Sequence, residues 1–87
     1  MGKYRLLVRK SAAGELEAIP KKDLQRIVKR IEALVEDPRP PGSEKLSSRE
    51  RYRIRQGDDR IVYSIDNARR VVEIFKVGHR SEVYRDR

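Results

Sequence analysis

The sequence predicts an α+β fold: an N-terminal strand, a two-helix hairpin and then a three-stranded antiparallel meander, in a single domain over residues 1–87. We expect one sheet of about four strands with both helices on one of its faces. Apolar residues recur at every second position near the start and through the second half of the chain, but at every third or fourth position in between. Prolines and glycines mark the boundaries between these segments.

The first strand is expected at residues 3–9, where basic and apolar side chains alternate. Its apolar face holds Tyr4, Leu6 and Val8. A short helix follows over residues 12–19, with Ser11 as its N-terminal cap. Pro20 ends this helix because proline cannot continue the hydrogen-bonded backbone.

A long helix is expected over residues 21–36. Its apolar stripe, spaced for one buried face, consists of Leu24, Ile27, Val28, Ile31, Leu34 and Val35. Pro38 pushes the preceding residue out of the helical region, so the helix ends at Asp37. The two helices form a hairpin joined at Pro20.

The second half of the chain predicts strands at 49–55, 60–65 and 71–77, joined by turns at 56–59 and 66–69. The last strand carries apolar residues at both parities, which is typical of a central strand. In the first of these strands every odd position is Arg.

Alternation groups the arginines on one side of this meander. If Tyr52 and Ile54 face the core, then Arg60 on the return strand falls on the same side as Arg53 and Arg55. We expect this face, opposite the helices, to be uncovered. We also expect this face to be strongly positive. The acidic residues of the hairpin that could neutralise its arginines are Asp58 and Asp59, and both lie in the turn.

The charge balance indicates a polyanionic partner, since 22 Lys and Arg against 14 Asp and Glu give a net charge of +8. Residues two apart on a strand are separated by roughly 6.6 Å, close to the spacing of phosphates along an extended nucleic acid. Guanidinium groups bind phosphate oxygens through paired hydrogen bonds. An ordinary solvated face is the alternative interpretation of the arginines.

The composition also excludes several kinds of chemistry. With no Cys and one His, the chain has no disulfides, no thiol catalysis and no zinc site built from several imidazoles. We expect neither a metal nor a cofactor. There is no apolar run of membrane-spanning length, so a cytoplasmic location is expected.

The last residues, which we expect to fold back beside the meander, carry two further candidates. His79 is the one side chain here that accepts a proton near neutral pH without special tuning, but an ordinary surface histidine is the alternative. Tyr84 could stack on an unpaired base, or it could close the end of the core.

Three motifs, together with the order of elements, resemble the RelE/ParE toxin superfamily of type II toxin-antitoxin systems. They are YRIR at 52–55, GDDRIVY at 57–63 and VGHRSEVY at 77–84, with weaker support from Asp37-Pro38 and Lys45-Leu46. RelE-like members are endoribonucleases that enter the ribosomal A site and cut mRNA without a metal, by attack of a ribose 2′-OH on the adjacent phosphate. The resemblance therefore implies an mRNA interferase.

The resemblance also assigns roles to individual residues. It implies a catalytic set of Arg60, His79, Arg80 and Tyr84, and an RNA-binding set of Lys45, Arg51, Arg53 and Arg55. Arg60 and Arg80 match phosphate-binding arginines of the family, and Tyr84 matches a tyrosine that stacks on the target base. The family often has lysines where this chain has Arg53 and Arg55. Because arginine does not lose its proton, His79 becomes our candidate for the general base.

Two alternative functions and one partner accompany this interpretation. A ParE-like toxin shares the fold but inhibits DNA gyrase, and a catalytically weak member would bind RNA or the ribosome without cutting. In every toxin of this kind the family implies a cognate antitoxin, expected here to be acidic and partly disordered when free. No membrane partner is expected.

Overall fold

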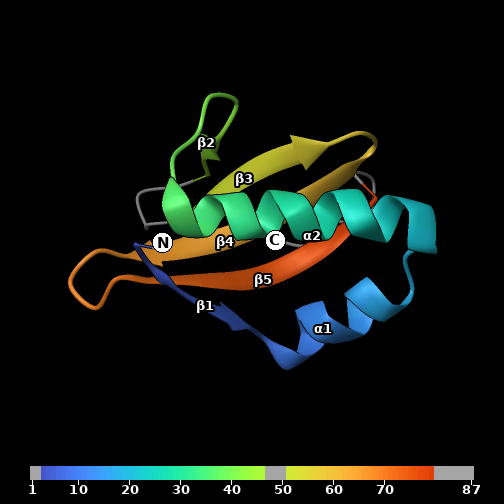
Figure 1. Cartoon of the computed structure of the whole chain (residues 1–87), viewed down its shortest axis with the longest axis horizontal. Helices are drawn as coiled ribbons and strands as arrows, with labels where there is room; N and C mark the ends of the chain where they lie inside the picture. Colours follow the sequence, from blue (N-terminus) through green and yellow to red (C-terminus); the bar gives the residue numbers. More distant parts are fainter. Residues whose placement is uncertain (1–2, 47–50, 80–87) are drawn as a thin grey trace.

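The structure, a computed structural model, describes residues 3–46 and 51–79 and has two helices and one five-stranded sheet (Figure 1). The elements are β1 (Arg5–Val8), α1 (Lys10–Glu17), α2 (Lys21–Glu36), β2 (Glu44–Lys45), β3 (Arg51–Gln56), β4 (Asp59–Asp66) and β5 (Val71–His79). This confirms the predicted α+β fold. The sheet has one strand more than the approximate number predicted, because the two residues of β2 pair with the outer side of β3.

The strand order in the sheet is β1-β5-β4-β3-β2. β3, β4 and β5 form the predicted antiparallel meander, and β1 pairs with β5 in parallel, with Arg5 opposite Val71 and Val8 opposite Ile74. A parallel pair needs a long crossover connection, which the two helices help to provide. The turn between β3 and β4 is tight, and Gly57 adopts a positive φ of 62° there.

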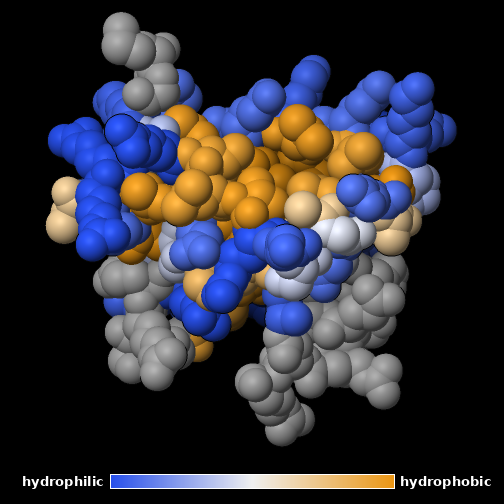
Figure 2. Space-filling model, turned by 90° about the horizontal axis from the view of Figure 1, so that it is seen from below, coloured by the Kyte–Doolittle hydropathy of each residue, from blue (hydrophilic) through white to orange (hydrophobic). Residues whose placement is uncertain are grey.

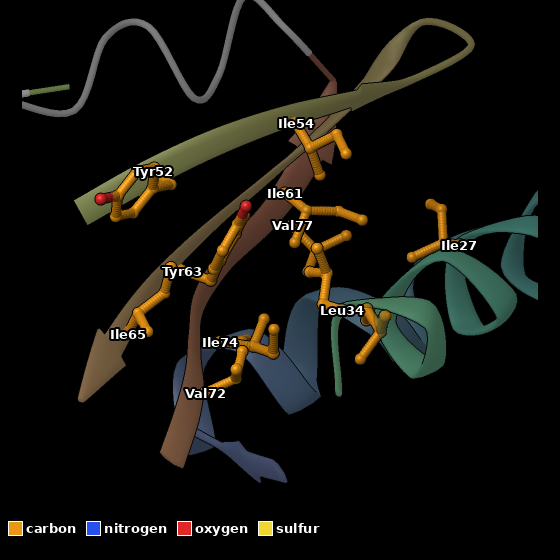
Figure 3. Close-up of a cluster of buried hydrophobic side chains, with 12 residues drawn as sticks. Ile27, Leu34, Tyr52, Ile54, Ile61, Tyr63, Ile65, Val72, Ile74 and Val77 are labelled. Carbon is orange, nitrogen blue, oxygen red and sulfur yellow. The ribbon is translucent and has the colours of Figure 1, made fainter. Parts of the chain in front are cut away.

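The long helix α2 covers one face of the sheet (Figure 1). The helix is amphipathic, and of its predicted apolar stripe the side chains of Ile27, Ile31 and Leu34 are buried. Figure 3 shows Ile27 and Leu34 on the helix side of the sheet, together with core side chains of the strands. The helix ends at Glu36, just before Asp37 and Pro38, as the sequence predicts.

The short helix α1 begins earlier than predicted, and Ser11 is not its cap. The cap position is Arg9, whose side chain makes no capping hydrogen bond. Ser11 instead lies in the first turn and donates a hydrogen bond to the carbonyl of Phe75, at 3.5 Å. Glu15 accepts a hydrogen bond of 2.8 Å from the backbone N–H of Val77. This carboxylate therefore gives a hydrogen-bond partner to a backbone N–H of β5 that lies beyond the end of β1.

Two tyrosines predicted to lie in the core are confirmed there. The rings of Tyr52 and Tyr63 stack with centroids 5.8 Å apart, and Tyr63 is fully buried. The hydroxyl of Tyr63 donates a hydrogen bond of 2.6 Å to the carbonyl of Pro38. The loop that follows α2 is thereby attached to the middle of the sheet. None of the helices in the described ranges is long and apolar enough to cross a membrane.

Replacing Tyr63 with Phe should lower the free energy of unfolding by about 1–3 kcal/mol, because the Pro38 carbonyl would lose its buried partner. Tyr4→Phe is the matched control. Its hydroxyl makes an exposed hydrogen bond of 3.2 Å to Asn67, so the loss should stay below about 0.5 kcal/mol. Urea denaturation of the two variants measures both values, and equal losses would contradict the buried role of Tyr63.

The stability should also fall at high pH. Burial raises the pKa of Tyr63 from 10.0 to about 12. Between these values the unfolded chain releases a proton that the folded chain retains, so unfolding becomes easier by about 1.4 kcal/mol for each pH unit. The stability difference between the parent and Tyr63→Phe should therefore shrink as the pH rises from about 10 towards about 12. Two parallel stability curves over this range would mean that the ring of Tyr63 is not shielded from water.

Candidate nucleic-acid interface

The register of β3 and β4 sorts their side chains onto two faces. Buried apolar pairs face α2: Tyr52 with Tyr63, and Ile54 with Ile61. The residues between them point to the opposite face because side chains alternate along a strand. That opposite face, which we call the arginine face, carries Arg51, Arg53, Arg55 and Arg60. The grouping that alternation predicts is therefore present.

The four arginines differ in how far they reach solvent. Arg55 is exposed, whereas Arg60, directly opposite it, is only 2% exposed. Arg53 forms an ion pair with Glu44, and its side chain is 16% exposed. Arg51 lies with its guanidinium carbon 4.0 Å from the ring centre of Phe75. Arg55 therefore presents its charge to a phosphate most openly of the four.

Phe75 belongs to this face although the sequence did not single it out. The register of β4 and β5 shifts between Val62 and Tyr63, so Val62 lies opposite Lys76 while Tyr63 lies opposite Ile74. Phe75 occupies the irregularity, and the guanidinium of Arg9 also lies over its ring, at 4.7 Å. Cations over an aromatic ring are held electrostatically. The signal in the sequence was the presence of apolar residues at both parities of the last strand.

The expectation that acids reach this face only from the turn is wrong. Glu44 pairs with Arg53 across β2 and β3, and Glu73 lies opposite Ser64 of β4, 3.8 Å from the Nε of Arg9. Both glutamates were overlooked because neither β2 nor the partner of β1 was predicted. Part of the positive charge is therefore already balanced.

The remaining predicted site residues have different positions. Lys45 lies opposite Tyr52, so the register places it on the helix side and not with the arginines. His79 is the last residue of β5, so the strand continues two residues beyond its predicted end. It lies opposite Asp59, one position away from Arg60, so the register does not group position 79 with the arginines. Arg80 and Tyr84 lie outside the described residues.

Another arginine reaches the edge of this region from α2. Arg30 lines a hollow of about 310 Å³ together with Gly42, Glu44, Arg53, Ile54 and Arg55. Its helical position next to the apolar stripe gave no signal in the sequence. Helix and sheet therefore both contribute guanidinium groups beside the exposed Arg55.

A second hollow, of about 420 Å³, lies between the helix hairpin and the turn after β3. Its charged lining is acidic and consists of Glu15, Asp23, Asp58 and Asp59. Carboxylates repel phosphate, so this hollow is a poor candidate for binding RNA. Within residues 3–46 and 51–79 there is also no group of three or more His, Cys, Asp or Glu residues that could hold a metal.

Comparison with solved structures defines the class of protein: the fold is that of RelE toxins. An archaeal RelE-RelB complex from Pyrococcus horikoshii OT3 has a TM-score of 0.78 and 26% identity, over 90% of this chain and 96% of that one. A mutant of the E. coli toxin RelE in the free state has a TM-score of 0.79 and 26% identity, over 99% of this chain and 94% of that one. The RelBE2 toxin-antitoxin complex from Mycobacterium tuberculosis has a TM-score of 0.78 and 24% identity, over 88% of this chain and 98% of that one.

The family follows from the sequence comparison. Residues 6–84 match the model of the ParE toxin of the type II toxin-antitoxin system parDE. The chain therefore belongs to this family, within the RelE/ParE toxin superfamily that its motifs resemble. No curated protein sequence matches the chain.

The Glu44 ion pair yields a test of the arginine face. Glu44→Gln removes the carboxylate beside Arg53 and should strengthen binding of a short single-stranded RNA at low salt by roughly two- to fivefold. Glu32→Gln makes the same change of charge at an exposed position on α2 and should have less effect. Fluorescence anisotropy measures both. Equal gains in the two variants would mean that RNA senses only the net charge of the chain.

Proposed function

We propose that the chain is a ribosome-dependent endoribonuclease, the toxin of a type II toxin-antitoxin pair, which cuts mRNA in the ribosomal A site. The observation that carries this proposal is the convergence of Arg51, Arg53, Arg55 and Arg60 on one face of the sheet. The likeness to RelE structures adds support. Arginines aimed at a phosphate stabilise the charge that develops on its oxygens during in-line attack.

In the proposed reaction the ribose 2′ oxygen attacks the adjacent phosphorus, and the bond from phosphorus to the 5′ oxygen breaks. His79 takes the proton from the 2′-OH, and the leaving 5′ oxygen takes a proton from a solvent water and becomes a hydroxyl. His79 then returns its proton to solvent, so that no net proton is gained or lost. The products are a cyclic phosphate and a free 5′-OH, and no water is consumed. The ribosome positions the reacting groups and so contributes a large part of the rate.

The arginines have different roles in this proposal. Arg55 binds phosphate directly because it is exposed. Arg60 lies almost entirely below the surface, where its charge is screened less by salt and raises the positive potential of the face. Arg80 holds the scissile phosphate, and Tyr84 stacks on the target base. Arg51 and Arg53 bind neighbouring phosphates. Lys45 lies on the helix side, so in this proposal it contacts a part of the RNA that extends beyond the arginine face.

We further propose a cognate antitoxin as the protein partner. Two of the similar structures are RelE-type toxins in complex with RelB or within a RelBE pair. A net charge of +8 favours an acidic partner. The partner and the cleavage activity are separate parts of the proposal, because a toxin of either activity class would have an antitoxin.

Inhibition of DNA gyrase is the second candidate function, since the matching family model describes a ParE toxin. One experiment separates the two. The protein is added to ribosomes translating a defined mRNA and, in parallel, to gyrase with relaxed plasmid. Codon-positioned 5′ ends indicate the nuclease, and loss of supercoiling indicates the gyrase inhibitor. If neither occurs, the remaining interpretation is a catalytically weak RNA-binding or ribosome-binding member of the fold.

His79→Ala should slow single-turnover cleavage on programmed ribosomes by at least roughly a hundredfold, because a general base contributes about 10²- to 10⁴-fold. Lys29→Ala, at an exposed position on α2, is the control and should cut at the parental rate. Cleavage by the His79 variant at the parental rate would remove His79 from the mechanism.

A further inference from the structure

The ring of Phe75 brings together two arginines that are far apart in the chain. The guanidinium carbon of Arg51, on β3, lies 4.0 Å from the ring centre, and that of Arg9, which follows β1, lies 4.7 Å from it. The sum of these distances, 8.7 Å, is the greatest separation that the two guanidinium carbons can have. In the sheet β1 and β3 are separated by β5 and β4, so the pairing of strands alone does not bring these two charges together.

The irregularity in β5 explains why the ring lies among cations. Val62, on the arginine face, lies opposite Lys76, whereas Tyr63, on the helix side, lies opposite Ile74. Phe75 is the extra residue between these two pairs. An extra residue interrupts the alternation of a strand and redirects a side chain. The half-buried ring of Phe75 is thereby placed on the arginine face.

The two arginines keep most of their positive charge at this position. An aromatic ring attracts a cation but supplies no negative charge to balance it. Glu73 lies 3.8 Å from the Nε of Arg9, and the two side chains are 35% and 52% exposed. An ion pair this long and this exposed is weak. Ser64, which lies between Arg51 and Glu73 in the register, is uncharged.

The surface around β1 is otherwise poorly suited to an anion. Figure 2 shows the side of the molecule on which β1 lies in Figure 1, and a broad hydrophobic area crosses it between hydrophilic borders. Leu6, Leu7 and Val8 of β1 are exposed, and Arg9 follows them directly. Apolar surface does not bind phosphate, because the anion would lose its hydration without gaining hydrogen bonds. A phosphate on this side therefore needs a cation beside β1, and Arg9 is already held in place by the ring.

One phosphate group can contact both arginines. A guanidinium that donates hydrogen bonds of about 2.8 Å to phosphate oxygens has its carbon roughly 4 Å from the phosphorus. Two guanidinium carbons that share one phosphate are therefore separated by roughly 8 Å at most. The limit of 8.7 Å that the ring imposes is close to this value. The ring thus keeps the two arginines within reach of a single anion.

We propose that Arg9 and Arg51 together bind one phosphate group of a single-stranded RNA, and that Phe75 is the positioning residue that holds both guanidinium groups for it. Arg51 and Arg55 are separated by roughly 13 Å along β3, which is about two phosphate spacings, so one RNA strand reaches both. The inference deepens the proposed function and rests on it for the identity of the ligand as RNA. It does not depend on cleavage.

Fluorescence anisotropy of the full chain with an eight-nucleotide single-stranded RNA, over a series of salt concentrations, tests this site. Arg9→Gln should weaken binding by roughly three- to tenfold and reduce the slope of log Kd against log salt by about 0.7, the contribution of one phosphate. Arg5→Gln removes the same charge at the other end of β1, from an exposed position, and should weaken binding by less than about twofold. Equal losses in the two variants would mean that RNA senses only the net charge, which overturns the proposal.

A second set of variants tests the positioning role of Phe75. Phe75→Leu keeps an apolar side chain but removes the aromatic face and should weaken RNA binding by roughly threefold, whereas Phe75→Tyr keeps the ring and should bind as the parent does. When Arg9 and Arg51 are both replaced by Gln, Phe75→Leu should have no further effect, because the ring acts only through these arginines. The same loss with and without the arginines would overturn the proposal. Thermal unfolding checks that each variant is folded.

An acidic protein segment is the competing occupant of this site. A ten-residue polyglutamate peptide identifies it in the same assay. If Arg9→Gln weakens binding of the peptide but leaves binding of the RNA unchanged, the arginines recognise carboxylates and the proposal is overturned.

The proposed function fails or stands separately. A chain that binds RNA through Arg9 but leaves mRNA intact on the ribosome retains this inference and loses the nuclease function. A chain that cuts mRNA, while Arg9→Gln and Arg5→Gln bind RNA equally well, retains the nuclease function and loses this inference.

Discussion

The register between β3 and β4 is the constraint on which the rest of the molecule depends. It places Tyr52 opposite Tyr63 and, on the other face, Arg55 opposite Arg60. A slip by one residue would turn the arginines into the core and the tyrosines into solvent. The stacked tyrosines and the hydrogen bond from Tyr63 to the Pro38 carbonyl resist such a slip. The same contacts that stabilise the core therefore also hold the arginine face in place.

The sequence predicted those parts of the fold whose signal is local. The stripe of α2 repeats over the whole helix, and each strand of the meander shows alternation, so both were found. β2 has two residues, too few for any periodicity to be recognised, and exists because it can pair with β3. The cap of α1 was misplaced because Ser11 bonds to the distant Phe75 carbonyl, a tertiary contact that competes with the local capping preference.

The same distinction separates what was and was not predicted of the arginine face. Alternation within one hairpin brings Arg53, Arg55 and Arg60 together, so the sequence was sufficient to predict that these three residues share a face. The contact of Arg51 with Phe75 depends on a register irregularity between β4 and β5, and the ion pair of Arg53 with Glu44 depends on β2. Neither is visible from spacing within one strand, because each is decided by how two strands meet. Sequence pattern therefore predicts which charges share a face but not which of them are already balanced.

The strand order also decides how the cations of this face are spread. β1 and β3 are three steps apart in the sheet, so roughly 14 Å separates β1 from the strand that carries Arg55. Arg9, which follows β1, and Arg51 of β3 nevertheless both lie over the ring of Phe75 on the strand β5. One aromatic ring therefore holds cations that come from two strands which are not neighbours, and it does so without adding a negative charge to the face.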